Sequence, residues 1–104
     1  MVAKSRTFAV IGLGNFGSTV ATELARFGND VIGIDLDEKL VSSHVETISQ
    51  AFIADSRDEL ALREAGLGEC DAAVIAMGSD IESSILSAMN LKLIGVPLIW
   101  AKAT

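Results

Sequence analysis

Short apolar runs alternate with amphipathic segments along the whole chain, and this alternation predicts the secondary structure. Five runs are largely apolar on both faces, which is typical of parallel strands buried beneath helices. The runs are 8–11, 31–35, 51–54, 72–76 and 98–101. Between them, apolar positions recur at helical spacing, and we expect two such stripes to face the sheet. The stripes are Phe16, Val20, Leu24 and Phe27 in the first helix, and Ile81, Ile85, Met89 and Leu93 in the last.

Polar residues and glycines between the apolar runs mark where helices begin and end. The stretches that start at Ser56 and Ser79 fit the S-x-x-E capping box, and Asp37 precedes a further helical stretch. Glycine is typical of the position just after a helix. Three glycines are expected there: Gly28, Gly66 and Gly95.

The order of these elements predicts the fold class. A βαβαβαβαβ chain with right-handed crossovers forms an α/β doubly wound parallel sheet, Rossmann-like, with strand order 3-2-1-4-5. We expect residues 1–104 to form one nucleotide-binding domain, because this length and a hydrophobic content of 50% suffice for a single core. No sixth strand follows, which predicts that the sheet is truncated before its sixth strand.

Composition narrows the range of partners. A net charge of −6, with the basic residues scattered, argues against a nucleic-acid partner. Cys70 is the only cysteine, and no Cys/His cluster has metal-ligand spacing, so we expect no internal disulfide, no metal and a reducing, cytoplasmic compartment. No apolar run approaches the roughly 20 residues that span a bilayer. Any membrane role is therefore expected to act through a partner, without insertion.

The letters GLGNFG at residues 12–17, between the first strand and the first helix, fit the dinucleotide-binding pattern G-x-G-x-x-G. In this pattern Gly12 makes the tight turn, Gly14 lets the backbone approach a pyrophosphate, and Gly17 lets the helix pack closely on the sheet. The N-terminus of the helix then offers free N–H groups to the phosphates. A glycine turn that holds no ligand is the alternative.

Two residues inside the loop and one acid after it are further candidates. Asn15 is a candidate donor to a phosphate, and Phe16 belongs to the same loop but is expected to pack in the core. Asp35 ends the second strand, 18 residues past Gly17, where a carboxylate accepts hydrogen bonds from ribose hydroxyls and repels a 2′-phosphate. NADP is therefore disfavoured. Asp37 is expected to cap a helix instead of contacting the ligand.

The carboxyl ends of the third and fourth strands add weaker candidates. Asp55 is placed either to accept from an adenine amino group or to lie as a solvated acid in a turn. Helix capping alone explains Ser56. Ala76, Met77 and Gly78 end the fourth strand at the switch point of the sheet, where small residues leave room for ribose and phosphates or simply lead into a glycine turn.

The sequence supports binding more than catalysis. A dehydrogenase needs a proton-transfer group near its nicotinamide, yet the chain has no tyrosine. His44 falls late in the second helix and is expected to be a surface or partly buried residue. Cys70 falls at the opposite end of the sheet and is interpreted as a structural thiol. The loop also lacks the Lys-Ser/Thr ending of a phosphate-hydrolysing P-loop.

Taken together, these motifs resemble the N-terminal nucleotide-binding domain of potassium-transport regulators, the KTN or RCK N domain of Ktr and Trk regulatory subunits. The segments that carry the resemblance are 8–17, 31–35, 54–56, 71–78 and 98–103. The resemblance implies ATP/ADP or NAD(H) as ligand, held by the three loop glycines, with Asp35 on the ribose and Asp55 with Ser56 near the adenine. Many Ktr-like members carry arginine where this chain has Asn15, which affects discrimination between ATP and ADP.

The resemblance also implies a homo-oligomer, a dimer or ring, beneath a membrane potassium channel or transporter at the inner face of the plasma membrane. Nucleotide exchange would reshape this ring and alter ion flux. Two alternatives stay open: the cofactor half of an NAD-dependent dehydrogenase, and a nucleotide sensor of another carrier such as a proton antiporter. The last helix is apolar on more than one face, as an intersubunit surface or a helix packed inside a larger domain would be. Its apolar residues are Ile81, Ile85, Leu86, Met89, Leu91, Leu93 and Ile94.

Overall fold

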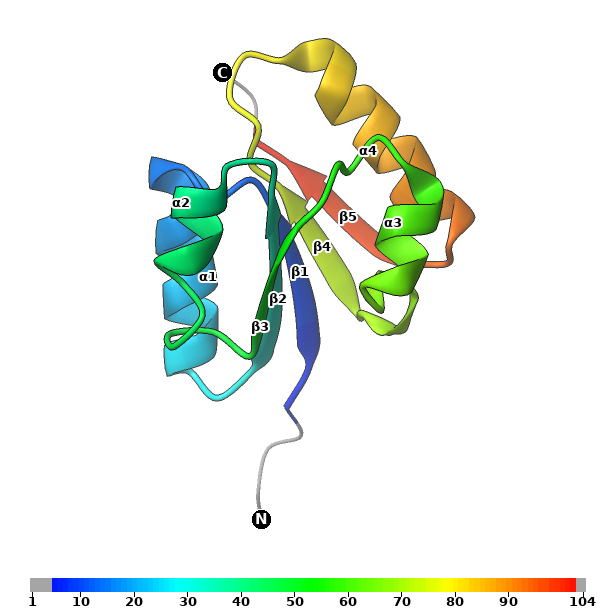
Figure 1. Ribbon diagram of the computed structural model, residues 1–104. Coiled ribbons are helices and arrows are strands. Elements are labelled where there is room, and N and C mark those ends of the chain that lie inside the picture. Colours follow the sequence, from blue (N-terminus) through cyan, green and yellow to red (C-terminus); the bar gives the residue numbers. More distant parts are fainter. Residues whose placement is uncertain (1–4, 103–104) are drawn as a thin grey trace.

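The computed structural model describes residues 5–102, which form a five-stranded parallel sheet with helices on both faces (Figure 1). The strand order is β3-β2-β1-β4-β5 and every neighbouring pair is parallel, which confirms the predicted doubly wound fold. The strands are β1 (Thr7–Ile11), β2 (Asp30–Asp35), β3 (Gln50–Ile53), β4 (Ala72–Ile75) and β5 (Leu98–Ala101). The carboxyl ends of β1 and β4 therefore meet at the switch point, where such sheets bind ligands.

In the described part of the chain, four α-helices and a short 3₁₀ helix connect the strands. Helices α1 and α2 lie on one face of the sheet, and α3 and α4 lie on the other (Figure 1). The helices are α1 (Asn15–Arg26), α2 (Glu38–Ser42), α3 (Glu59–Glu64), η1 (Leu67–Glu69) and α4 (Ile81–Leu93). None of the helices within residues 5–102 is long and apolar enough to cross a membrane.

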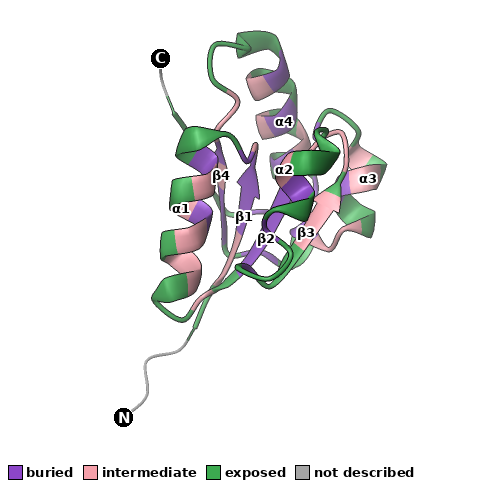
Figure 2. Cartoon of the chain, turned by 60° about the vertical axis from the view of Figure 1, so that its left-hand side comes forward, coloured by how far each residue is buried: buried purple, intermediate pink, exposed green. Residues whose placement is uncertain are grey.

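The core consists of two hydrophobic clusters, one on each face of the central strands. Alternate residues of β1 point to opposite faces, so Val10 packs in the α1/α2 cluster while Ala9 and Ile11 pack in the α3/α4 cluster. These three residues are 1% exposed or less. Figure 2 shows the central strands as buried beneath helices whose outward surfaces are exposed. Burial on both faces explains why the strands read as continuous apolar runs.

Aspartates cap three of the helices. Asp37 caps α2, as expected, while Asp58 caps α3 and Asp80 caps α4, each side chain accepting from a backbone N–H in the first helical turn. The expectation that Ser56 and Ser79 are the caps is therefore wrong. In both stretches an aspartate closer to the helix takes the position, and its charge also suits the positive end of the helix dipole.

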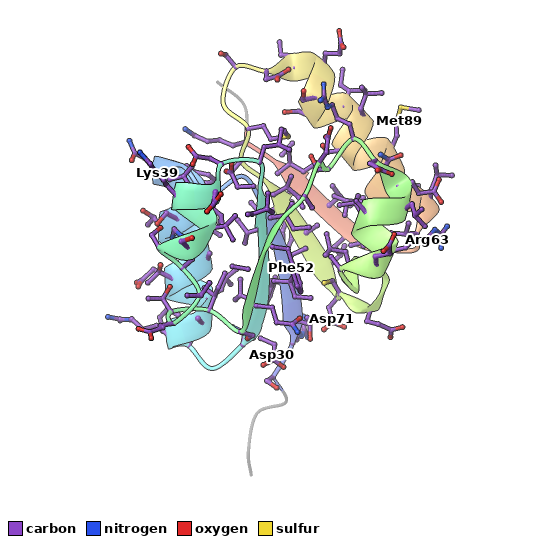
Figure 3. The ribbon with its side chains drawn as sticks, viewed as in Figure 1. Asp30, Lys39, Phe52, Arg63, Asp71 and Met89 are labelled. Atoms are coloured by element: carbon purple, nitrogen blue, oxygen red, sulfur yellow. The ribbon has the colours of Figure 1, made fainter. Side chains whose placement is uncertain are left out.

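The apolar stripe of α4 points to solvent, contrary to the prediction that it faces the sheet. Met89 is 57% exposed and projects away from the sheet in Figure 3. The other three stripe residues are also more than half exposed: Ile81, Ile85 and Leu93. The face that packs on the sheet carries small side chains and one leucine, namely Ser83, Ser87 and Leu91. Small residues let α4 approach β4 and β5 closely, leaving the larger residues outside.

At the two ends of α1, large apolar side chains are likewise exposed to solvent. Phe16 is 41% exposed and Phe27 is 76% exposed, so neither packs beneath the helix as expected. Val20 and Leu24 are partly buried against the α1/α2 cluster, as predicted. The fully buried positions of α1 are occupied by small residues, Gly17 and Ala21, which bring the helix close to β1.

Candidate functional site

A cleft of about 530 Å³ opens at the carboxyl ends of the strands. It passes over the switch point between β1 and β4 and reaches toward β3 at one end and β5 at the other. Of the ten residues expected at the site, nine line this cleft and Gly17 does not. The nine are Gly12, Gly14, Asn15, Phe16, Asp35, Asp55, Ser56, Ala76 and Gly78. The topology therefore brings together residues that are far apart in sequence.

The three glycines of the loop differ in what requires them. A Cβ on Gly12 would lie 2.4 Å from the carbonyl oxygen of Ala76, and one on Gly17 would lie 1.8 Å from that of Gly12. Gly12 also has φ +97°, which favours glycine. Gly14 has φ −71°, and among residues 5–102 a Cβ there would meet nothing within 4 Å. Packing thus accounts for Gly12 and Gly17, while the missing side chain of Gly14 only enlarges the cleft.

The N-terminus of α1 lies at this open position. Gly14 provides no side-chain cap and the first turn contains no acid, whereas α2, α3 and α4 each have both. The first backbone bond of α1 runs from the Ser18 amide to the Gly14 carbonyl at 2.8 Å. The amides of residues 15–17 precede it and are the free donors of a helix start. This helix end can accept a negatively charged group.

Asp35 holds the glycine loop in place, a role that the sequence did not indicate. One carboxylate oxygen accepts from the Leu13 amide at 2.7 Å, and the other accepts from the Asp37 amide at 2.8 Å. Asp35 thereby ties the end of β2 to the loop that follows β1. A carboxylate oxygen has two lone pairs, so Asp35 keeps capacity to accept from a ligand hydroxyl at the edge of the cleft.

Asp55 is bound to a neighbouring cation, Arg57, which the sequence reasoning did not single out. The guanidinium donates from Nε to one carboxylate oxygen at 3.0 Å and from Nη2 to the other at 2.9 Å. The Arg57 amide also donates to Asp55, at 2.9 Å. Hydrogen bonds from Arg57 hold the pKa of Asp55 below its usual value. The carboxylate therefore stays charged while its charge is balanced within the pair.

Ser56 is 4% exposed, and its hydroxyl forms a hydrogen bond with the hydroxyl of Ser87 on α4. The side-chain amide of Asn90, also on α4, donates from Nδ2 to the Ser56 carbonyl at 3.3 Å. Both hydroxyls contact the sulfur of Met77 at the end of β4, at 3.8 and 3.5 Å. Ser56 therefore fastens the loop after β3 to α4, in place of the capping role expected from the sequence.

Phe16 lines the cleft and is not a core residue. The ammonium of Lys102 lies over the Phe16 ring, 4.9 Å from the ring centroid, in a cation–π contact. Lys102 follows β5 directly and was not predicted to belong to the site, although its position at the carboxyl end of a strand is the same signal that selected Asp55. Leu36 and Leu40, which also line the cleft, carried no comparable signal.

With this geometry established, the TrkA-N domain profile matches residues 8–104, almost the whole chain. The chain belongs to the TrkA-N domain family. It is 41% identical over 98 residues to the Ktr system potassium uptake protein C of Bacillus subtilis, covering 94% of this chain and 44% of the relative. It is 38% identical over 103 residues to the Ktr system potassium uptake protein A of Vibrio alginolyticus, covering 99% and 47%. This TrkA-N domain spans about half the length of these relatives.

Solved structures agree on the fold of the TrkA-N domain. The NAD(P)-binding domain of an exopolyphosphatase-related protein from Archaeoglobus fulgidus superimposes with a TM-score of 0.80 at 26% identity, covering 95% of this chain and 74% of that one. The TrkA-N domain of the inner membrane protein ybaL from Escherichia coli gives 0.70 at 12% identity, covering 96% and 90%. The second likeness shows the fold alone.

Histidine and cysteine often take part in catalysis, but His44 and Cys70 of this TrkA-N domain are buried outside the cleft. His44 is 6% exposed, and its Nδ1 donates to the Leu40 carbonyl at 2.7 Å while Nε2 lies 2.7 Å from the Ser18 hydroxyl, linking α2 to α1. Cys70 is 3% exposed, and burial raises the pKa of its thiol to about 11. Neither residue lines the cleft. Within residues 5–102, no cluster of three His, Cys, Asp or Glu side chains has the geometry to hold a metal ion.

Proposed function

We propose that this TrkA-N domain is a nucleotide-binding regulatory module of a potassium uptake system. The observation that carries the proposal is the open side of Gly14: a Cβ there would lie within 4 Å of no atom that residues 5–102 place near it, yet its absence opens the cleft onto the uncapped start of α1. A phosphate group fits this position, because backbone amides and the helix dipole both favour negative charge there.

The rest of the cleft supports an adenine nucleotide in one orientation. With the phosphates at the start of α1, the ribose lies next to Asp35 at the end of β2, and the adenine lies toward Asp55 and Ser56 beyond β3. The remaining lone pairs of Asp35 suit the two ribose hydroxyls, and its charge opposes a 2′-phosphate. The candidate ligands are therefore ATP/ADP or NAD(H), with NADP disfavoured.

The module acts on a membrane partner. The two relatives described above are named as proteins of the Ktr potassium uptake system, which supports a potassium channel or transporter subunit as the partner of this chain. The ligand changes the balance between two states of a homo-oligomer at the inner face of the plasma membrane, provided that it binds one state more tightly. The domain binds its nucleotide without transforming it.

The oligomer is proposed to use the outward face of α4, where Ile81, Ile85, Met89 and Leu93 are each more than half exposed. Met89→Asp places a charge in the middle of this face and is expected to reduce the mass measured by light scattering at high concentration. Phe27→Asp, which adds the same charge at an exposed apolar residue outside α4, is the control. An oligomer that persists in Met89→Asp would contradict the use of this face.

Nucleotide binding is tested by calorimetric titration of the purified chain with ATP, ADP, NAD, NADH and NADPH in parallel. We expect at least one of the first four to bind and NADPH to bind more weakly than NADH. Failure of all five nucleotides to bind at millimolar concentration would refute the proposed function. Tighter binding of NADPH than of NADH would contradict the role given to Asp35.

A further inference from the structure

The cleft carries two basic side chains, and they lie at its opposite ends. Arg57 follows β3 and Lys102 follows β5, the two edge strands of the sheet. They are the only lysine or arginine among the residues that line the cleft in the described part of the chain. The end of the cleft that attracts a negatively charged group is the end whose cation is not neutralised by a carboxylate.

At the β3 end the positive charge is already balanced. Asp55 receives two bonds from the guanidinium of Arg57, at 3.0 and 2.9 Å, which is a bidentate ion pair. The carboxylate of the nearby Asp80 is also engaged within the protein, because it accepts a hydrogen bond from the Ser83 backbone amide at 3.0 Å and so caps α4. This end therefore offers a ligand neutral contacts and acceptors, as a nucleobase needs.

At the β5 end, no carboxylate of residues 5–102 balances the positive charge. Within residues 5–102, Lys102 forms no ion pair, and its ammonium lies over the ring of Phe16 at 4.9 Å. A cation–π contact orients an ammonium without cancelling its charge. The Lys102 amide donates to the Ile75 carbonyl at 3.1 Å, which fixes the backbone of this residue at the end of β4.

Phe16 is the second residue of α1, so its contact holds the Lys102 ammonium near the free amides of the helix start. With the adenine toward β3 and the first two phosphates at these amides, a chain of phosphates continues toward β5. The next negative charge along the ligand then arrives where Lys102 supplies a positive one. A dinucleotide instead places a second ribose there, which has no charge to pair with the ammonium.

The geometry points to Lys102 as the residue that makes the cleft prefer a nucleoside triphosphate, through contact with its third phosphate. This inference rests on the proposed function, because it assumes that the phosphates lie at the start of α1. It assigns Phe16 a positioning role, since the ring sets where the ammonium lies.

The test is calorimetric titration of the wild-type chain, Lys102→Gln and Lys102→Arg with ATP, ADP and NADH. Lys92→Gln is the matched control, because Lys92 is an exposed lysine on α4 outside the cleft. We expect Lys102→Gln to weaken ATP about tenfold, the size of one charge-assisted contact. ADP and NADH are expected to change by less than about twofold, Lys102→Arg to keep the preference, and Lys92→Gln to match the wild type.

Equal weakening of ATP and ADP by Lys102→Gln, or no change in either, would overturn the inference while leaving nucleotide binding intact. A wild-type chain that binds NADH more tightly than ATP would overturn it as well. A wild-type chain that binds no nucleotide would instead refute the proposed function on which the inference rests. Raising the salt concentration gives a second readout, since the preference of the wild type for ATP should shrink more than that of Lys102→Gln.

Discussion

Replacing Gly14 with alanine is expected to separate ligand binding from folding. The backbone of Gly14 has φ −71°, and a Cβ there would meet no atom of the described chain within 4 Å, so the fold has room for it. Alanine is a poorer helix-capping residue than glycine by about 1 kcal/mol or less. Its lower entropy in the unfolded chain offsets this by about 0.4–1 kcal/mol. We therefore expect the free energy of unfolding to change by less than about 1 kcal/mol.

Binding is expected to respond far more strongly to Gly14→Ala. The new methyl group occupies the space through which a phosphate would reach the amides at the start of α1. Losing one hydrogen bond to a charged group costs about 1.5–3 kcal/mol, which is about ten- to 150-fold in Kd. Calorimetric titration with the tightest-binding nucleotide measures the loss, and urea denaturation of the ligand-free chain measures stability.

Gly17→Ala is the contrasting variant in the same loop. Its Cβ would lie 1.8 Å from the Gly12 carbonyl oxygen, so α1 or the loop must move. Forcing this overlap is expected to cost about 3 kcal/mol of stability or more. If Gly14→Ala bound nucleotide as tightly as the wild type, or lost as much stability as Gly17→Ala, the distinction drawn between the two glycines would be refuted.

Three further predictions concern other residues. Asp35→Ala removes the acceptor of the Leu13 amide and is expected to lower the free energy of unfolding by about 2 kcal/mol without ligand; unchanged urea denaturation would argue against its structural role. Cys70, with its thiol pKa raised from 9.0 to about 11, is expected to react with a thiol reagent at pH 8 roughly a hundredfold more slowly when folded than when denatured; equal rates would show that it is accessible. The pKa of Asp55 is lowered from 3.8, so its ionised form stabilises the fold above that pH and the effect is lost as pH falls through the folded value. Asp55→Asn should therefore lose less stability than the wild type on acidification below about pH 4; identical acid denaturation curves would contradict this.

The strand order and the location of the cleft were predictable from the sequence, because both follow from regularities that act along the chain. Apolar runs of strand length gave all five strands to within a residue or two. The doubly wound pattern with right-handed crossovers then gives the strand order 3-2-1-4-5, and the glycine pattern locates the loop at the end of β1. Asp35, Asp55 and Ala76 could be placed around one cleft on that basis alone.

The orientation of α4 could not be predicted in the same way. A helical repeat shows which residues share a face, but not which face is buried when a small-residue face competes with a larger apolar one. Ser83 and Ser87 pack on the sheet because buried serines can satisfy their hydroxyls, as Ser87 does with Ser56. The pairing of Arg57 with Asp55 and of Lys102 with Phe16 likewise depends on side-chain directions that spacing does not record.

The interlocking of Gly12 and Gly17 has a consequence for how such domains diverge. Because each is required by contact with backbone atoms, a descendant that had lost its ligand would still be selected to keep both, simply to fold. Residue 14 is under no such constraint and would be free to drift toward alanine or serine once the ligand was gone. Among domains with this loop, the amino acid at the position of Gly14 would therefore separate lineages that still bind a nucleotide from those that retain only its fold.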